Sequence, residues 1–371
     1  MNSAYRSARA TAAVLAIAAA CWGCAGHREP PAEPVAAPAS SARPAAERSP
    51  APPSSTAPDP AAVGADELGL VPILMYHRIV ERTESVYDRT PAAFRAELER
   101  LAAEGYVPVT ATEYATGRID IPAGAHPVVL TFDDGDPTQF ALGPDGGPAP
   151  GTAIAILLDV AARHPGFRPV ASLYVNAAPF GSADGSGVLP WLRDHGFEIG
   201  NHTRDHTNLA SAGDAGAQEA IALGQREIQR ALPDHRVTSL ALPFGVAPAN
   251  AVLAVRGGAD GTSYDHACVL LVGANPAPSP HSTDFDPLNT PRIRSQDATG
   301  QEAEYGSTAW LDKLAAAPGS RYTSDGDPER ISYPAARGAV VAPGVAARGH
   351  ADGACELRAV VWGPVAGGAA T

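Results

Sequence analysis

The sequence predicts an α/β fold in which parallel β-strands form a barrel covered by helices. From about residue 68 onward, strand-like segments alternate with helix-like segments. The strand-like segments are continuously apolar, which is typical of a parallel sheet buried on both faces. Seven or so such units occur without a dinucleotide-binding fingerprint, and this favours a barrel over an open, doubly wound sheet. In barrels of this kind the chemistry takes place at the carboxyl ends of the strands.

Each element is predicted in order along the chain. Val71–His77 is a continuous apolar strand, and Thr90 followed by Pro91 gives the next helix an N-cap and a first position, so that helix runs to Gly105. The later predicted strands, each an apolar run, are Tyr106–Thr110, Val128–Phe132, Val170–Asn176, Phe197–Gly200, Thr238–Leu242, Ala267–Val272 and Pro291–Arg294. The later predicted helices are Ala153–His164, a short helix near Trp191, Ala217–Leu232 and Thr308–Ala316.

Composition and charge exclude several classes of protein. Hydrophobic residues make up 45% of the 371-residue chain, which is enough for a substantial core. The 37 Gly and 36 Pro together outnumber the charged residues, and this excludes a coiled coil or an all-helical bundle. The net charge is −13, and a chain this acidic does not attract the negatively charged phosphates of DNA or RNA. No nucleic-acid partner is therefore expected.

Residues 1–24 are predicted to be an export signal. Arg6 and Arg9 precede an apolar run, Ala12–Ala20, that is too short to span a bilayer. Cys21 ends a stretch of small residues that resembles a bacterial lipoprotein cleavage box, in which the cysteine becomes the lipid-bearing N-terminus. An ordinary signal peptide cut nearby is the alternative. The expected product is an exported lipoprotein, tethered to a membrane and facing the periplasm or the cell surface.

The rest of the chain divides into three predicted regions. Residues 25–67 are expected to be a disordered Pro/Ala-rich linker, since 22 of the 40 residues from His27 to Asp66 are Pro or Ala. Residues 68–337 are expected to form the catalytic barrel. Residues 338–371, which include the strand-like Arg358–Trp362, are either a C-terminal extension or a segment that closes the barrel.

Two adjacent carboxylates follow the strongest predicted strand. Asp133 and Asp134 come directly after Phe132 and before Gly135. Carboxylates at the end of a buried strand are costly unless they are solvated, paired or bound to a metal. A simple Asp-Asp-Gly turn is the alternative, because these residues are common in turns.

A pair of histidines follows the strand predicted at 197–200. His202 and His206 are four residues apart, so on a helical turn they would share one face and could grip one cation. Two ordinary surface histidines are the alternative. One carboxylate with two histidines is a common catalytic ligand set that leaves positions open for water and substrate. A barrel would bring this pair together with the Asp133–Asp134 pair.

These motifs resemble those of the polysaccharide deacetylase family of carbohydrate esterases. Thr131–Gly135 (TFDDG) and His202–His206 (HTRDH) resemble its first two motifs, and Leu242–Gly245 (LPFG) resembles its third. The opening Val71–Ile79 (VPILMYHRI) is similar to the start of the domain in an exported bacterial branch. The ordered set covers roughly residues 70–294 and is more specific than any single motif.

The resemblance implies a deformed (β/α)7-type barrel that hydrolyses N-acetyl groups on sugar polymers. It implies that Asp133 is the general base and that Asp134, His202 and His206 bind a divalent metal ion, with Zn²⁺ as the first choice. It also implies that the backbone N–H of Phe244 binds the oxyanion. The implied partner is an acetylated glycan such as peptidoglycan, poly-N-acetylglucosamine or a chitin-like chain.

Two family positions are not matched. Ala241 stands where the third motif has an arginine that orients the base, and Arg292 or Arg294 could replace it from a later strand. The family's last motif, which supplies a histidine as general acid, has no counterpart in the sequence. The candidates for the acid are His281 and His266. His77 lies at a strand end, where it could line the cleft, and a packed histidine beside Tyr76 is the alternative.

Three functions therefore compete. The first is a metal-dependent N-deacetylase, and the second is an O-acetyl polysaccharide esterase that uses the same metal and base. The third is a catalytically impaired barrel that binds glycan, which the two unmatched positions would explain. The intact set of Asp133, Asp134, His202 and His206 favours an enzyme.

Overall fold

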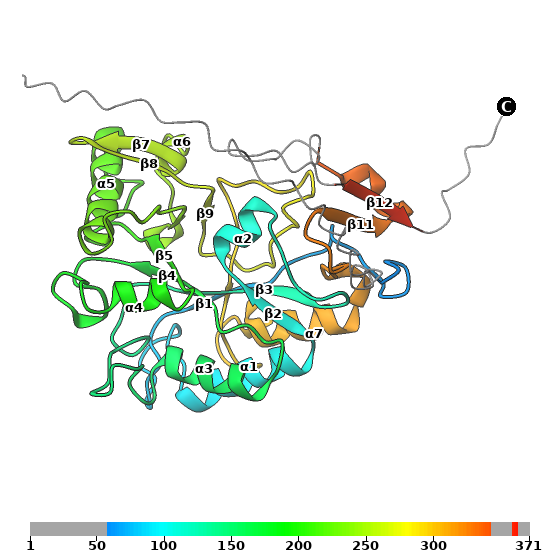
Figure 1. Ribbon diagram of the computed structural model, residues 1–371. Coiled ribbons are helices and arrows are strands. Elements are labelled where there is room, and N and C mark those ends of the chain that lie inside the picture. The colour runs from blue at the N-terminus through cyan, green and yellow to red at the C-terminus, as the bar shows by residue number, and fades with distance from the viewer. Residues whose placement is uncertain (1–57, 343–357, 363–371) are drawn as a thin grey trace, which may run out of the picture. The chain divides into compact units, whose positions relative to one another are not determined.

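The computed structural model describes residues 58–342 and 358–362, and the predicted α/β barrel fold is confirmed in it (Figure 1). The main sheet has eight parallel strands, with the order β10-β1-β3-β4-β5-β6-β9 and with β2 beside β3. Its strands are β1 (Ile73–Tyr76), β2 (Tyr106–Val109), β3 (His126–Phe132), β4 (Ser172–Val175), β5 (Glu198–Asn201), β6 (Ser239–Ala241), β9 (Cys268–Leu270) and β10 (Ile293–Arg294). The helices are α1 (Pro91–Ala103), α2 (Ala111–Thr116), α3 (Ala153–Arg163), α4 (Leu189–Asp194), α5 (Gly213–Ala231), α6 (Val252–Val255) and α7 (Ser307–Ala316).

The sheet curls so that its two edges come together. The amide of Thr290, three residues before β10, donates to Val269 O in β9 at 3.0 Å, and the amide of Leu271 donates to Thr290 O at 2.9 Å. The barrel is deformed at β3, because β2 pairs with residues 126–129 of this strand and β4 with residues 131–132. Seven strands are thus paired one after another in the sheet. The eighth strand, β2, pairs only with β3, along the part of β3 that β4 does not reach.

Two cores lie on opposite faces of the strands. On β3, Val128, Leu130 and Phe132 belong to the core that also contains Phe94 and Leu98 of α1. Val129, between them, belongs to a second core inside the barrel that includes Ile73, Tyr174 and Leu270. This alternation follows from the two-residue period of a strand, and it determines which residues at the strand ends face the interior.

The helices α1 and α3 begin where the sequence predicts, whereas α5 begins at Gly213, four residues before its predicted start. Thr90 caps α1 by accepting a hydrogen bond from the amide of Ala93, with Pro91 at the first helical position. Figure 1 shows α1, α3 and α7 along one side of the sheet. The helix α2, which the sequence analysis missed, has a full capping box between Thr110 and Glu113.

Two small sheets lie outside the barrel. The hairpin of β7 (Arg256–Ala259) and β8 (Thr262–Asp265) was also missed and packs on α5 (Figure 1). The predicted strand Arg358–Trp362 is present as β12, and it pairs in parallel with β11 (Arg330–Pro334) in a separate two-stranded sheet. The boundaries of the signal and C-terminal regions remain predictions, and residues 1–57 lie outside the described part of the chain. The linker predicted to run to residue 67 ends earlier, because the amides of Asp66 and Glu67 donate to the carbonyls of Thr323 and Ser332.

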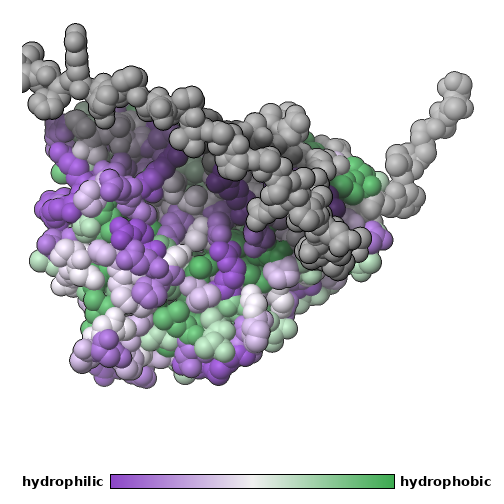
Figure 2. Space-filling model, in the orientation of Figure 1, coloured by the Kyte–Doolittle hydropathy of each residue, from purple (hydrophilic) through white to green (hydrophobic). Residues whose placement is uncertain are grey.

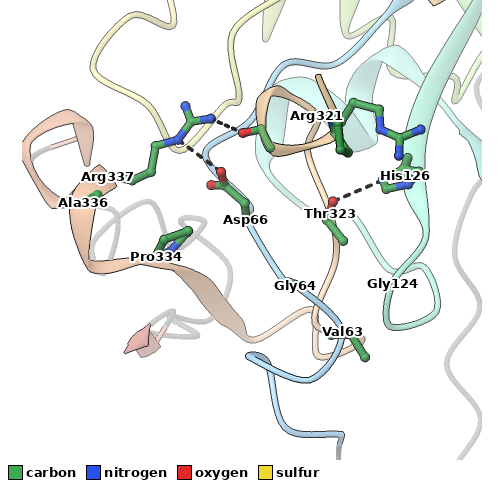
Figure 3. Close-up of a pocket in the computed structure, with 12 residues that line it drawn as sticks. Val63, Gly64, Asp66, Gly124, His126, Arg321, Thr323, Pro334, Ala336 and Arg337 are labelled. Carbon is green, nitrogen blue, oxygen red and sulfur yellow. Dashed lines mark hydrogen bonds and ion pairs between the residues drawn. The ribbon is translucent and has the colours of Figure 1, made fainter. Parts of the chain in front are cut away.

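One cavity, of about 720 Å³, lies at the amino end of β3 (Figure 3). Its lining includes His126, whose ring contacts the Thr323 hydroxyl at 3.2 Å, and Arg337, which pairs with Asp66 at 3.1 Å. A seven-residue strand is roughly 20 Å long. This cavity is therefore far from Asp133 at the other end of β3, and it takes no part in the chemistry discussed below.

Within the described part of the chain, none of the helices combines the length and the apolar character that a bilayer span requires. Figure 2 shows that hydrophilic residues are spread over the visible face and are interspersed with smaller hydrophobic areas.

Candidate active site

Alternation along two neighbouring strands turns Asp133 and His77 toward the inside of the barrel. On β3, Val129 and Thr131 face the interior, and Asp133 is the next residue on that face. Asp133 is 1% exposed, and its amide donates to the carbonyl of Tyr76 at the end of β1. His77, the next residue of that chain segment, interacts electrostatically with Asp133.

Arg292 is the partner of Asp133. Its two terminal nitrogens donate to the two carboxylate oxygens of Asp133 at 2.7 and 2.6 Å, in a bidentate pair that is fully buried. Its Nε donates to Leu271 O at 2.7 Å, so the guanidinium connects the residues that follow β9 and β3 inside the barrel. Of the two arginines suggested to replace the one missing at Ala241, the structure therefore brings Arg292 to Asp133.

Arg294 is not brought to the base. Its guanidinium donates to the side chain of Gln296 at 2.6 Å and to the carbonyl of Gln301 at 3.0 Å, at the rim of the barrel. The catalytic role suggested for Arg294 is therefore not supported by its position, because these contacts turn the guanidinium away from Asp133.

Opposing effects act on the Asp133 carboxyl group. Burial alone raises its pKa, but the guanidinium of Arg292 and the imidazole of His202 outweigh burial and hold the pKa of Asp133 well below the usual 3.8. The carboxylate therefore stays ionised at neutral pH, which is the state that a general base requires.

Asp134, His202 and His206 form a candidate metal site. The Oδ1 of Asp134 lies 3.4 Å from Nε2 of His202 and 3.6 Å from Nε2 of His206. The ligand atoms of all three residues lie within 4.8 Å of one another. The Nδ1 of His202 donates to the carbonyl of Ala241 at 2.8 Å, which leaves Nε2 as the nitrogen available for a cation. The three residues thus fit a divalent ion with open positions.

The two histidines are brought together by a bend, so the predicted helical turn is wrong. Residues 202–206 have no helical structure, and Thr203 and His206 have positive φ values of 58° and 49°. Asn176, at the end of β4, fixes this bend by donating to the carbonyls of His202 and Thr203, both at 2.8 Å. The imidazole rings meet with their centroids 4.9 Å apart.

Backbone strain is concentrated at this cluster. Asp134 and Phe244, like Thr203 and His206, have positive φ, at 75° and 59°. Each such residue costs on the order of 1–3 kcal/mol and persists only where its surroundings enforce it. Half of the eight non-glycine residues with positive φ in the described chain are these four. This concentration of strained residues supports a functional role for the cluster.

Phe244 lies at the rim of the cluster. It belongs to the turn η2 (Pro243–Gly245) that follows β6, and its ring centroid lies 4.4 Å from that of His206. The side chain is 61% exposed, which is unusual for a phenylalanine and leaves an apolar surface beside the candidate metal site. The structure thus places the third motif next to the second.

His77 is a member of the cluster, whereas His281 and His266 are not. The Nδ1 of His77 is buried and has no hydrogen-bond partner within residues 58–342 and 358–362. His281 instead lies against Gly117 and Tyr322, toward the amino ends of the strands. The Nδ1 of His266 donates to Ala254 O, and the ring stacks on Tyr264. The role of general acid suggested for His281 therefore fails on position.

Gln139 and Asn176 are supporting residues that the sequence analysis missed. Gln139 is fully buried, and its side-chain amide donates to the carbonyls of both His77 and Asp133, which ties the ends of β1 and β3 together. Asn176 could have been noticed as a polar residue at the end of a predicted strand. Gln139 lies in a loop and carries no local signal.

Loss of the Asp134 carboxylate is expected to remove the metal. The Asp134→Ala variant should bind Zn²⁺ more than about 100-fold more weakly than the parent, since even the loss of a residue that only supports a ligand costs 10–100-fold. The matched control is Asp205→Ala, because Asp205 lies within the same bend but is exposed and pairs with Arg204. Calorimetric titration of both full-length variants with Zn²⁺ checks this, and equal affinity in the two variants would contradict the assigned ligand set.

Comparison with known proteins relates part of this chain to one protein family. Residues 176–257 match the family model described as polysaccharide deacetylase. No curated protein matches the sequence.

Three solved structures are similar to this chain. A Bacillus anthracis protein described as a polysaccharide deacetylase (BA0330) is 19% identical with a TM-score of 0.48, over 65% of this chain and 69% of that one. The polysaccharide deacetylase BC0361 of Bacillus cereus is 20% identical with a TM-score of 0.45, over 61% and 64%. IcaB of Ammonifex degensii is 17% identical with a TM-score of 0.44, over 65% and 97%.

Proposed function

We propose that this chain, of which residues 176–257 match the polysaccharide deacetylase family model, is a hydrolase that removes N-acetyl groups from an acetylated polysaccharide. Peptidoglycan, poly-N-acetylglucosamine and chitin-like glycans are the candidate substrates. The observation that carries this proposal is the position of a buried, ionised Asp133 beside the group formed by Asp134, His202 and His206. A base next to an open cation site is the arrangement that hydrolysis of an acetyl group needs.

The residues of this chain have distinct roles in the proposed reaction. Asp134, His202 and His206 would hold the ion, which when bound polarises the acetyl carbonyl and acidifies water. Asp133 accepts a proton from the attacking water at a carboxylate oxygen. Arg292 keeps that carboxylate ionised and fixes its orientation through the bidentate contact.

Phe244 and His77 complete the proposed site. The turn that contains Phe244 has the sequence of the family's third motif and lies against His206, so its amide is a candidate donor to the oxyanion. His77 is the one imidazole of this cluster outside the ligand set, and its buried Nδ1 has no partner among the described residues. We assign His77, in place of His281, as the group that protonates the leaving amine.

Replacement of His77 with glutamine is expected to lower kcat by about 10²–10⁴-fold, the range typical for a lost general acid. Burial lowers the pKa of His77, and the carboxylates of Asp133 and Asp134 oppose this only in part. An acid acts only while protonated, so the parent rate should fall as pH rises through the pKa of His77, and this descending limb should disappear in the variant.

The control for this variant is its metal content. His77→Gln should bind Zn²⁺ as the parent does, because His77 is not a ligand. Unchanged kcat and an unchanged pH profile would exclude His77 as the acid, whereas loss of metal would show that it supports the ligands.

One screen distinguishes the proposed N-deacetylase from an O-acetyl esterase and from a glycan-binding barrel without activity. The full-length chain, loaded with Zn²⁺, is incubated with N-acetylated and O-acetylated oligosaccharides, and released acetate and product mass are measured. Acetate from N-acetylated chains is the expected result. Acetate from O-acetylated chains alone would establish an esterase, and tight binding without acetate from any chain would establish a glycan-binding barrel.

We also assign an exported, membrane-tethered location to the protein. The support is the predicted export signal of residues 1–24, the lipoprotein-like Cys21 and the predicted Pro/Ala-rich linker at 25–67. A long linker would let the barrel reach a glycan at a distance from the membrane.

A further inference from the structure

A second cavity lies at the same end of the barrel as the candidate active site. It has a volume of about 300 Å³, and its lining includes Tyr87, Val272, Arg294, Glu302 and Tyr305. Arg294 is the last residue of β10, and Tyr305 is the last residue of the short helix η3 (Ala303–Tyr305) before α7. This is the place where the structure puts Arg294 instead of beside Asp133.

Two residues that line the cavity contact the active-site cluster or its immediate neighbours. The ring centroid of Tyr87 lies 4.8 Å from that of His77. On another side, Val272 packs against Gly245, where an added Cβ would lie 2.7 Å from the Cβ of Val272. Gly245 follows Phe244 in the same turn. One lining residue therefore lies beside His77 and another beside the turn of Phe244, so the cavity is adjacent to the candidate active site on two sides.

The lining combines aromatic surface with a charged pair. Tyr305 is 49% exposed, so about half of this residue has no protein partner to cover it. The guanidinium of Arg294 lies 3.7 Å from the carboxylate of Glu302 and 5.8 Å from the ring centroid of Tyr87. Contacts to Gln296 and Gln301 hold this guanidinium in place. The cavity thus presents a fixed donor, an acceptor and a flat apolar face.

A pyranose ring matches these three features. Its C–H face can lie on an aromatic ring, while its hydroxyl groups both donate and accept hydrogen bonds. An anionic sugar matches them less well, because the carboxylate of Glu302 is exposed and the whole chain carries a net charge of −13. The chemistry of the cavity therefore favours a neutral sugar.

Resting on the proposed function, we propose that this cavity is a glycan subsite that binds a neutral sugar ring next to the one that loses its acetyl group. Tyr305 is the stacking surface, and Arg294 with Glu302 binds the hydroxyl groups. The substrate is then a chain of at least two uncharged rings rather than a single acetylated sugar.

The test compares two substrates of the full-length, Zn²⁺-loaded chain. The measured quantity is the ratio of kcat/KM for an N-acetylated glucosamine tetrasaccharide to kcat/KM for the small ester p-nitrophenyl acetate. Tyr305→Ala is expected to lower this ratio about tenfold, mainly through a higher KM for the tetrasaccharide. Tyr305→Phe should retain the ratio, because it keeps the ring. Val252→Ala, which alters an exposed apolar side chain on α6 outside the cavity, is the matched control.

Each outcome decides the proposal. A ratio that Tyr305→Ala and Arg294→Met both leave unchanged would overturn the subsite, and a higher kcat/KM for an oligosaccharide with uronic acid rings would overturn its neutral character. If the parent releases no acetate, calorimetry with the intact tetrasaccharide separates the two proposals. Weaker binding to Tyr305→Ala would then support the subsite although the proposed function had failed, and equal binding would overturn both.

Discussion

The Asp133→Asn variant is expected to lose acetate release by about 10²–10⁴-fold, the contribution of a general base. An asparagine amide cannot accept the proton of the attacking water at neutral pH. The ligands Asp134, His202 and His206 are unchanged, so the variant should bind one Zn²⁺ per chain as the parent does. Acetate release and metal content are measured on the same full-length preparation.

The stability of this variant must be checked beside its activity. The Asp133→Asn substitution would leave Arg292 buried and without its ionic partner, so a fall in Tm is expected together with the fall in rate. The assay is therefore run well below the Tm of the variant. Retention of activity in a folded, metal-loaded Asp133→Asn chain would contradict the assignment of Asp133 as the base.

Replacement of Arg292 with methionine is expected to destabilise the fold by about 3–5 kcal/mol, the cost of leaving one partner of a buried ion pair uncompensated. Both side chains of the pair are at most 2% exposed, so water cannot replace the lost contacts. The variant also leaves the carbonyl of Leu271 without the Nε donor. Denaturant unfolding of the parent and the variant measures this loss.

The pH dependence of stability gives a second readout for the same pair. The pKa of Asp133 is depressed in the folded parent, so the ionised pair contributes its stability at neutral pH and loses it only as pH falls below the ordinary value of 3.8 toward the lower folded value. In Arg292→Met, burial acts on Asp133 without the guanidinium, so lower pH should favour the variant by protonating the carboxyl group.

A surface arginine provides the control for Arg292→Met. Arg193→Met removes a pair with Asp194 in which both side chains are about half exposed, and such pairs contribute roughly 0–1 kcal/mol. Equal destabilisation by the two substitutions would contradict the importance of the buried pair. The double variant Asp133→Asn/Arg292→Met should recover part of the stability, because no unpaired charge remains.

Most of the barrel could be predicted because its strands carry strong local signals. Val128–Phe132 is continuously apolar, and Thr90-Pro91 provides a cap and a first helical position for α1. The missed hairpin also had a signal, since Asp260-Gly261 is a typical two-residue turn, with φ values of 47° and 78° at these residues. The missed α2 had its capping box, but six residues are too few to show helical periodicity.

The sequence predicts which residues lie at the ends of neighbouring strands and so come together in the site. It does not predict how deep inside the barrel each side chain lies. Residues two apart on a strand share a face, so alternation cannot separate Arg292 from Arg294. Arg292 lies one layer deeper and reaches Asp133, whereas Arg294 lies at the rim. The spacing of His202 and His206 indicated correctly that the two imidazoles lie together. It indicated a helical turn wrongly, because the bend depends on Asn176 from another strand.

A metal titration of activity tests most directly whether the Asp134, His202 and His206 site is required for acetate release. The full-length chain is stripped of metal by chelation and reloaded with Zn²⁺ in steps, while acetate release from an N-acetylated oligosaccharide is followed. We expect no acetate without metal and a rate that rises linearly to a plateau at one ion bound per chain, with no such rise in Asp134→Ala. Acetate release by the metal-free chain, or an equal rise in Asp134→Ala, would contradict this requirement.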